Sequence, residues 1–379
     1  MNNLNPKDGI FSRGSLPVLL CFSHLRWNFV YQRPQHLMSH AAKNFRVLYI
    51  EEPLFEPVTP NLRIQFDPSG VCIITPILNR ECDHVNEQRR MIAELMVMLD
   101  APQVLQWFYT PMALELAANI RADLVIYDCM DELTAFRFAP VELRDREKEL
   151  LARADLVFTG GASLFAAKRL LHAEVLCYPS SVDREHFGQA RNRPTDPLDQ
   201  AALPHPRIGY FGVIDERMDL NLVARASSLM PDVQFVMVGP VVKIDPAHLP
   251  KAHNIHWLGS KSYADLPAYL GNWQAGWMPF ALNEHTRFIS PTKTPEFLAA
   301  GLPVTSTAVA DVVADWGRED LVRIADPESM VAALQASLGP QEAKWRRRVD
   351  DRLSAMSWDE TWRSMQAQIV AKLHLGVTA

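Results

Sequence analysis

Short apolar runs alternate with amphipathic stretches along most of the chain. In the first half, each apolar run ends at polar residues, which is typical of buried parallel strands. The strands expected there span residues 16–22, 45–50, 104–108, 124–127, 156–159 and 175–178. Helical spacing is found at 34–42, 91–99, 111–120 and 163–171. Strands separated by helices of this length predict βαβ crossovers and a parallel sheet.

The same alternation begins again after a proline-rich polar stretch. Four prolines fall among polar residues, so we interpret residues 191–206 as an interdomain linker. Beyond it, strands are expected at 207–211, 234–238, 255–258, 275–278 and 321–324, with another beginning at Val304. Helices are expected at 220–229 and 263–270, and the tail from Gln341 is helical. We therefore predict an α/β fold with two Rossmann-like doubly wound domains, residues 1–190 and 207–355, and a C-terminal helix over 356–379.

Composition restricts the classes of function. A chain of 379 residues exceeds what a single hydrophobic core usually serves, which agrees with two domains. The net charge of −6 argues against a nucleic-acid partner. We find no apolar run of membrane-spanning length and no signal-peptide pattern in residues 1–9. The five cysteines are scattered without a CxxC pair, which indicates reduced cytosolic thiols and argues against a zinc site. A cytoplasmic location is expected.

The stretch from Ile289 to Thr307, ISPTKTPEFLAAGLPVTST, predicts a loop, a helix and a strand in succession. Ser290 and Thr292 are candidate N-caps, and Gly301 ends the helix. Lys293 and Glu296 are three residues apart and therefore share a helix face. A lysine opposes the helix dipole at this end unless an anion is bound there, so the pair indicates a phosphate site. The alternative is a surface ion pair beside an ordinary cap.

Ligands of open α/β sheets bind beyond the carboxyl ends of the strands, so the loops there are candidate sites. After the strand at 207–211, Gly212 permits close approach of a ligand to the backbone, and Arg217 is placed for an anion. The segment lacks the GxGxxG dinucleotide fingerprint. Alternatively, the glycine only serves the turn.

Two loops of the first half carry further candidate residues. In Tyr127–Glu132, Asp131 could act as a general base on a substrate hydroxyl. An N-cap, a solvated acidic turn or a metal-binding DxxD pair are the alternatives. After the first strand, the residues expected to contact an anionic or sugar acceptor are His24, Arg26, Trp27 and Arg33. In the alternative interpretation, this loop is solvated and Trp27 packs in the core.

Taken in order, these motifs resemble the GT-B glycosyltransferases over most of the chain. SPTKTPEFLAAGLPVTST resembles the family's donor-site segment, and GYFGVID resembles its C-terminal glycine loop. PSSVD with Phe187 is similar to the interdomain crossover segment, although Ser180 and Ser181 replace Asn and Gly. LRWNFVYQRPQHL and YDCMDEL resemble a bacterial branch associated with cell-surface polysaccharide synthesis. SWDETW resembles the helix that crosses back to the N-terminal domain.

The resemblance implies two domains facing a cleft, with a nucleotide-sugar held mainly by the C-terminal domain. The implied donor contacts are a lysine on the diphosphate and a glutamate on the ribose or sugar, here Lys293 and Glu296. Together with Thr292, Gly212 and Arg217 they form the expected donor set. The common retaining pattern E-x7-E would place its first glutamate at position 288, which is Phe288. This departure favours an inverting displacement with a single base, for which we choose Asp131.

The predicted function is transfer of a sugar from a nucleoside-diphosphate donor, for which we choose a UDP-sugar, to a hydroxyl of a lipid-linked or polysaccharide acceptor in cell-surface polysaccharide synthesis. Because the chain has no DxD motif and offers cationic groups, neither a metal nor another cofactor is expected. Peripheral contact with the inner membrane face would suit such an acceptor. Two alternatives stay open. A nucleotide-sugar epimerase of the same architecture would need no acceptor, and a degenerate transferase-like assembly protein would be non-catalytic.

Overall fold

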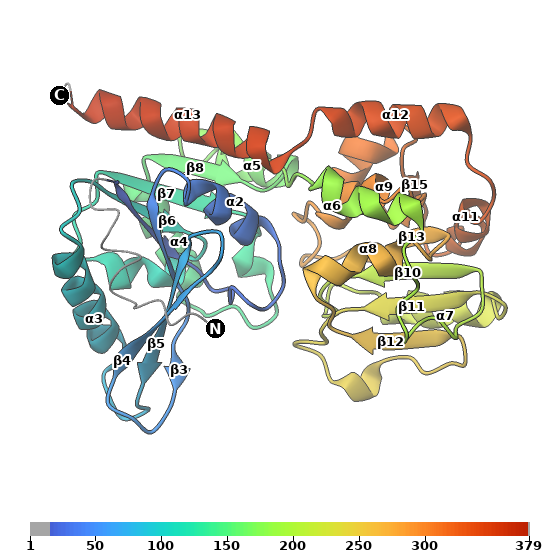
Figure 1. The fold of residues 1–379 in the computed structure, drawn as a ribbon, viewed down its shortest axis with the longest axis horizontal. Coiled ribbons are helices and arrows are strands. Elements are labelled where there is room, and N and C mark those ends of the chain that lie inside the picture. Colours follow the sequence, from blue (N-terminus) through green and yellow to red (C-terminus); the bar gives the residue numbers. More distant parts are fainter. Residues whose placement is uncertain (1–15, 378–379) are drawn as a thin grey trace. The chain divides into compact units, whose positions relative to one another are not determined.

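The computed structural model describes residues 16–377, which divide into two compact units (Figure 1). Unit 1 comprises the chain up to Gly160, Leu164–Tyr178 and the residues from Asp359; unit 2 comprises Gly161–Ser163 and Pro179–Trp358. The signal-peptide expectation concerns residues 1–9, which lie outside the described range. Within that range, no helix is both long and apolar enough to cross a membrane.

Unit 1 is built on a sheet of nine strands within the described residues. They are β1 Val18–Phe22, β2 Arg46–Ile50, β3 Leu54–Phe55, β4 Asn61–Phe66, β5 Cys72–Leu78, β6 Val104–Phe108, β7 Leu124–Cys129, β8 Leu156–Thr159 and β9 Val175–Cys177. Their order is β3-β5-β2-β1-β6-β7-β8-β9, all parallel, and β4 pairs antiparallel with β5. The sequence pattern gave no strand between residues 53 and 91, where β3, β4 and β5 lie.

Helices connect the strands of unit 1, and the C-terminal helix packs on this unit. The helices are α2 Arg33–Ala41, α3 His84–Leu99, η1 Pro111–Ala117, η2 Leu133–Ala135, α4 Leu143–Arg153, α5 Ala162–Lys168 and α13 Trp358–Val377. The Trp362 ring of α13 lies 6.3 Å from both Trp107 and Phe45, measured between ring centroids. Since all three side chains are buried, the core of unit 1 includes Trp362 of this helix. The predicted C-terminal helix therefore begins at Trp358, and residues 378–379 lie outside the described range.

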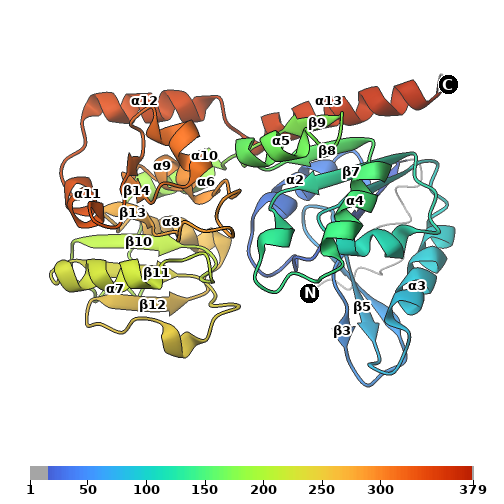
Figure 2. The same cartoon turned by 180° about the vertical axis from the view of Figure 1, so that it is seen from behind.

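Unit 2 contains a six-stranded, fully parallel sheet in the order β12-β11-β10-β13-β14-β15. Its strands are β10 Arg207–Phe211, β11 Gln234–Val238, β12 Ile255–Gly259, β13 Ala275–Met278, β14 Val304–Ser306 and β15 Arg323–Ile324. Its helices are α6 Arg184–Gly188, η3 Gln189–Asn192, α7 Leu220–Leu229, η4 Pro246–His248, η5 Tyr263–Asp265, α8 Leu266–Leu270, α9 Lys293–Ala299, α10 Ala310–Val312, the π-helical η6 Val313–Gly317, α11 Met330–Ser337 and α12 Ala343–Ser354. Helices cover both faces: α8 lies in front in Figure 1 and α7 in Figure 2.

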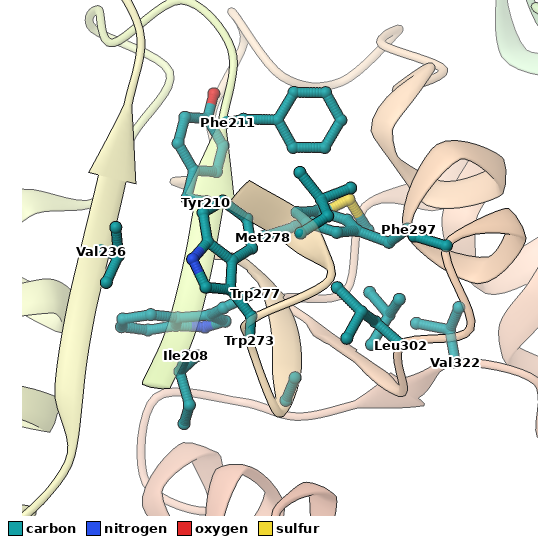
Figure 3. Packing of buried hydrophobic residues seen from close by; sticks show 14 of the residues in the cluster. Ile208, Tyr210, Phe211, Val236, Trp273, Trp277, Met278, Phe297, Leu302 and Val322 are labelled. Carbon is teal, nitrogen blue, oxygen red and sulfur yellow. The ribbon is translucent and has the colours of Figure 1, made fainter. Parts of the chain in front are cut away.

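The core of unit 2 fixes α9 against the end of β10. The Phe297 ring of α9 packs edge-on against Phe211, with 4.9 Å between centroids, and lies 6.4 Å from Trp273 (Figure 3). Gly276 of β13 allows this approach, because a Cβ there would lie 2.6 Å from the Phe297 ring. The Phe297 side chain therefore anchors the helix that begins with Lys293 in the core of unit 2.

The proline-rich stretch 191–206 is a folded part of unit 2 and not a linker between the units. Gln200 is fully buried and donates to Asp196 (2.7 Å) and to the carbonyl of Tyr269 (3.2 Å). The buried Arg207 guanidinium forms an ion pair with Asp196 at 2.7 Å. The main division of the chain accordingly falls between Tyr178 and Pro179.

Candidate functional site

Lys293 lies at the start of α9 in a compact polar cluster. Its Nζ donates to Glu296 Oε2 at 3.0 Å and to Thr292 Oγ1 at 2.9 Å, and stands 4.9 Å from the centroid of the Phe211 ring. The side chains of Lys293 and Glu296 are 14% and 5% exposed. The pair is thus largely buried, unlike the surface ion pair of the alternative interpretation. Three residues of the expected donor set lie together here.

Thr292 occupies the N-cap position of α9, but its side chain does not cap the helix. Its hydroxyl instead accepts a hydrogen bond from Lys293. The amides of Thr294 and Glu296 donate to the carbonyls of Pro291 and Thr292 within the first turn. The lysine ammonium is consequently the principal cationic group that this turn offers to an anion.

Glu296 is a buried carboxylate that depends on Lys293. Burial raises the pKa of Glu296 above its usual 4.5, and the adjacent Lys293 ammonium partly opposes this effect. Desolvation therefore outweighs the ion pair. Among residues 16–377, Lys293 is the ion-pair partner of Glu296, so a change in the position of Lys293 would directly change the environment of this carboxyl group.

Two glycines at neighbouring strand ends let the backbone pack closely beside the lysine. Gly212 follows β10 with φ +135°, and a Cβ there would lie 3.1 Å from Lys293 Cε. Gly239 follows β11 with φ +146°, and a Cβ there would lie 1.8 Å from the Gly212 carbonyl oxygen. Sequence reasoning singled out Gly212 and missed Gly239, although both follow predicted strands. The structure brings Gly212 next to Lys293, as a donor site requires.

Arg217 is held by a neighbouring acid that sequence reasoning also missed. Its guanidinium makes a two-pronged contact with Asp215, with Nη2 at 2.8 Å from Oδ2 and Nε at 3.0 Å from Oδ1. The Asp215 side chain is only 3% exposed, whereas that of Arg217 is 22% exposed. Arg217 therefore has a fixed orientation, and its charge is offset by a buried carboxylate.

In unit 1, Arg33 is buried and has a structural role. Its guanidinium binds both carboxylate oxygens of Asp128, with Nη2 at 2.9 Å from Oδ1, and its Nη1 donates to the Tyr178 carbonyl at 2.7 Å. Desolvation acts to lower the pKa of Arg33, but the adjacent Asp128 outweighs it and the pKa is raised. The side chain is 1% exposed, so the prediction that Arg33 contacts an acceptor is wrong. The same pairing occupies Asp128 and removes the DxxD metal alternative.

Asp131 lies in the partly exposed loop that follows β7. Of the other acids in this segment, Asp128 is paired with Arg33, and Glu132 lies 2.8 Å from the buried Lys168 ammonium. Two of the three carboxylates are therefore committed to internal ion pairs. Asp131 stands between them at a position that solvent reaches.

The remaining residues of the predicted acceptor set, which are His24, Arg26 and Trp27, lie in the loop after β1. Trp27 is 4% exposed, packs edge-on against Tyr49 with 5.0 Å between centroids, and donates through Nε1 to Asp67 at 2.9 Å. The prediction that Trp27 stacks on a sugar is wrong, because the ring is packed in the core. Arg26 donates to Glu51 Oε2 at 3.1 Å and to the carbonyls of Glu52 and Pro53. His24 is partly exposed in the same loop.

The chain is similar to known proteins in both sequence and structure. Residues 205–339 match the family of group 1 glycosyl transferases. The Bacillus subtilis protein TuaH, named as a teichuronic acid biosynthesis glycosyltransferase, is 26% identical over 220 residues, which cover 53% of this chain and 54% of TuaH. The match thus spans about half of that relative.

The whole fold is shared with solved structures. Sucrose-phosphate synthase from Thermosynechococcus elongatus superposes with a TM-score of 0.69 at 16% identity, covering 95% of this chain and 99% of that one. A UDP-forming α,α-trehalose-phosphate synthase from Burkholderia vietnamiensis gives 0.66 at 15% identity, covering 95% and 99%. The chain has the fold of the GT-B glycosyltransferases. The predicted two-domain α/β fold is confirmed, and the predicted resemblance to glycosyltransferases agrees with both sequence matches.

Within this GT-B chain, position 288 has no carboxylate. Phe288 is partly buried, and the Arg287 guanidinium lies 5.1 Å from its ring centroid. Glu284 contacts Arg287 at 4.0 Å and is 81% exposed. Among residues 16–377, no group of three or more His, Cys, Asp and Glu side chains is placed to hold a metal ion.

We predict that Arg33→Met lowers the free energy of unfolding by about 3–5 kcal/mol, because it leaves Asp128 buried without its partner. Urea unfolding followed by tryptophan fluorescence would measure the loss. Arg63→Met is the matched control, since Arg63 pairs with Glu56 at an exposed position and should cost at most about 1 kcal/mol. Equal stability of the two variants would contradict a structural role for Arg33.

Glu296 should make stability depend on pH in a defined direction. Because its pKa is raised in the folded protein, its stabilising contribution is complete below the unfolded value of 4.5 and is lost as pH rises through the folded pKa. The unfolding free energy of the wild type relative to Glu296→Gln should therefore fall between pH 4 and pH 8. Urea unfolding over a pH series would measure this, with the exposed Glu284→Gln as control. A difference that rises with pH would refute the assignment.

Proposed function

We propose that this protein transfers a sugar from a nucleoside diphosphate, most readily UDP, to a hydroxyl group of an acceptor. The observation that carries the proposal is the Lys293 cluster beside Gly212, which combines a largely buried ammonium with closely packed glycine backbone at two strand ends. The match to group 1 glycosyl transferases contains this whole cluster. A structural neighbour described as UDP-forming supports the choice of UDP.

Unit 2 would bind the donor through charge and backbone access. The Lys293 ammonium would exchange its contacts with Glu296 and Thr292 for diphosphate oxygens and offset the charge that grows on the leaving group. Arg217, already oriented by Asp215, would supply a second cation. Glu296, released from the lysine, would accept hydrogen bonds from the ribose hydroxyls. Gly212 would let the phosphates approach the backbone.

Asp131 of unit 1 would act as the general base. The acceptor oxygen attacks the anomeric carbon, its proton passes to the Asp131 carboxylate, and the bond from that carbon to the diphosphate oxygen breaks. Asp131 lies at a partly exposed position of this loop, where an acceptor hydroxyl could reach its carboxylate. With Phe288 where the retaining pattern has a glutamate, a single displacement with inversion is the mechanism we propose.

The acceptor that we propose is lipid-linked or a growing polysaccharide of the cell surface. This rests on the resemblance of the loop segments in unit 1 and on the name of the relative TuaH. Such an acceptor would place the protein in the cytoplasm, in peripheral contact with the inner membrane. Lys293 and Arg217 would do the work that a metal ion does elsewhere, so the reaction should need no metal.

Lys293→Ala should weaken nucleotide binding about 10- to 100-fold, because a hydrogen bond to a charged group contributes about 1.5–3 kcal/mol. Thermal shifts with UDP, GDP, ADP and TDP would first identify the nucleotide, since a ligand raises the melting temperature by mass action. Titration calorimetry would then give the affinities. Lys344→Ala, at an exposed position on α12, is the control. Unchanged affinity in Lys293→Ala would refute the donor site, and no shift with any nucleotide would favour the non-catalytic alternative.

Asp131→Asn should lower the rate of transfer about 10²- to 10⁴-fold, the range typical of a lost general base, without changing nucleotide affinity. The rate of UDP release in the presence of acceptor glycans would measure it. Asp145→Asn provides a control at an exposed acid. Near-wild-type transfer by Asp131→Asn would show that another group is the base. Conversion of the donor sugar without any acceptor would favour an epimerase.

A further inference from the structure

A buried cluster of charges adjoins the loop that carries Asp131. Lys168, the last residue of α5, is 3% exposed, and its Nζ lies 2.8 Å from Glu132 Oε2 and 2.7 Å from Glu147 Oε1. The side chains of Glu132 and Glu147 are 13% and 11% exposed. The Tyr127 hydroxyl donates to Glu147 Oε1 at 2.7 Å. The cluster thus joins α5, α4, β7 and the loop within unit 1.

The loop is fixed on both sides of Asp131. On one side, the Gly160 amide donates to the Cys129 carbonyl at 3.0 Å, and a Cβ on Gly160 would lie 2.7 Å from the Met130 carbonyl oxygen. On the other side, Glu132 is bound to Lys168 and accepts a hydrogen bond from Thr134 Oγ1 at 2.5 Å. The immediate neighbours of Asp131 in the chain, Met130 and Glu132, are therefore both held.

The surroundings of Lys168 and Glu132 favour the charged forms of both side chains. Burial acts to lower the pKa of Lys168, but its interactions with Cys129, Glu147 and Glu132 outweigh this and the pKa is raised. Burial acts to raise the pKa of Glu132, but the hydrogen bonds from Lys168 and Thr134 lower it overall. Apolar side chains could fill this space at no greater cost, since a buried ion pair is rarely more stable than good hydrophobic packing. The charges instead impose a defined geometry on the groups they join.

We infer that Lys168 is a positioning residue for Asp131, an inference that rests on the proposed role of Asp131 as general base. Through Glu132, the Lys168 ammonium holds the backbone on which Asp131 is carried. Without that cation, Glu132 and Glu147 would repel each other across a buried space, and Glu132 would move toward solvent. The Asp131 carboxylate would then lose its alignment with the acceptor hydroxyl, which costs rate and not donor affinity.

The two carboxylates on Lys168 provide a matched pair of variants. Glu132→Met and Glu147→Met each remove one partner of the same lysine, but only Glu132 belongs to the Asp131 loop. In the full-length protein, Glu132→Met should lower kcat about tenfold or more, because small misalignments of a catalytic group have large effects on rate. Its KM for the donor should be unchanged. Glu147→Met should keep kcat near that of the wild type despite a comparable loss of thermal stability.

Lys168→Met should lower kcat like Glu132→Met, and Lys168→Arg should restore most of it by keeping the cation. Equal kcat in Glu132→Met and Glu147→Met would show that the cluster is only structural and would overturn the inference. Should Lys168→Met not fold, the comparison of the two glutamate variants decides alone.

The Asp131→Asn variant distinguishes failure of the positioning role of Lys168 from failure of the general-base role of Asp131. Loss of transfer in that variant with normal kcat in Glu132→Met would refute only the positioning role. Normal transfer in Asp131→Asn would refute both.

Discussion

Charge that is removed from water at the carboxyl ends of the strands must be paired inside the protein, and both units are organised around this constraint. In unit 1, Arg33 pairs with Asp128, and Lys168 pairs with Glu132 and Glu147. In unit 2, Lys293 pairs with Glu296, and Arg217 pairs with Asp215. Each pair fixes a loop that follows a strand or the first turn of a helix. The same interactions that make burial tolerable therefore also place the groups proposed for chemistry.

The parts of the fold that could be predicted from sequence are those in which local pattern and burial agree. Val104–Phe108 and Arg207–Phe211 are buried almost throughout, so their apolar runs gave the bounds of β6 and β10. In contrast, β4 alternates partly buried and exposed positions and has no continuous apolar run. The apolar run of β5 is interrupted by Pro76, so neither strand was predicted. The stretch 191–206 has the composition of a linker, and only the long-range contacts of Gln200 and Arg207 show that it is folded.

The candidate site likewise contains contacts that the sequence could predict and contacts that it could not. Lys293 and Glu296 meet through three-residue helical spacing, which the sequence contains directly. Arg33 finds its partner 95 residues away, and Trp27 finds Asp67 40 residues away, so no local pattern could show that these side chains are engaged. Asp215 lies only two residues from Arg217, but an arginine after a strand was interpreted as a ligand-binding residue. A partner for it within the chain was therefore not expected. Polar residues after a strand are therefore as often internal partners as ligands.

The close contact of Gly212 and Gly239 has a consequence for how this site can evolve. The shape of the molecule there is set by main chain, and no other residue can be introduced at Gly239 without displacing the Gly212 carbonyl. Drift in sequence around the site can alter side chains on the surrounding loops, but it cannot reshape this stretch of backbone. Divergence of function would then have to proceed through the side chains around this backbone contact, while the contact itself is kept.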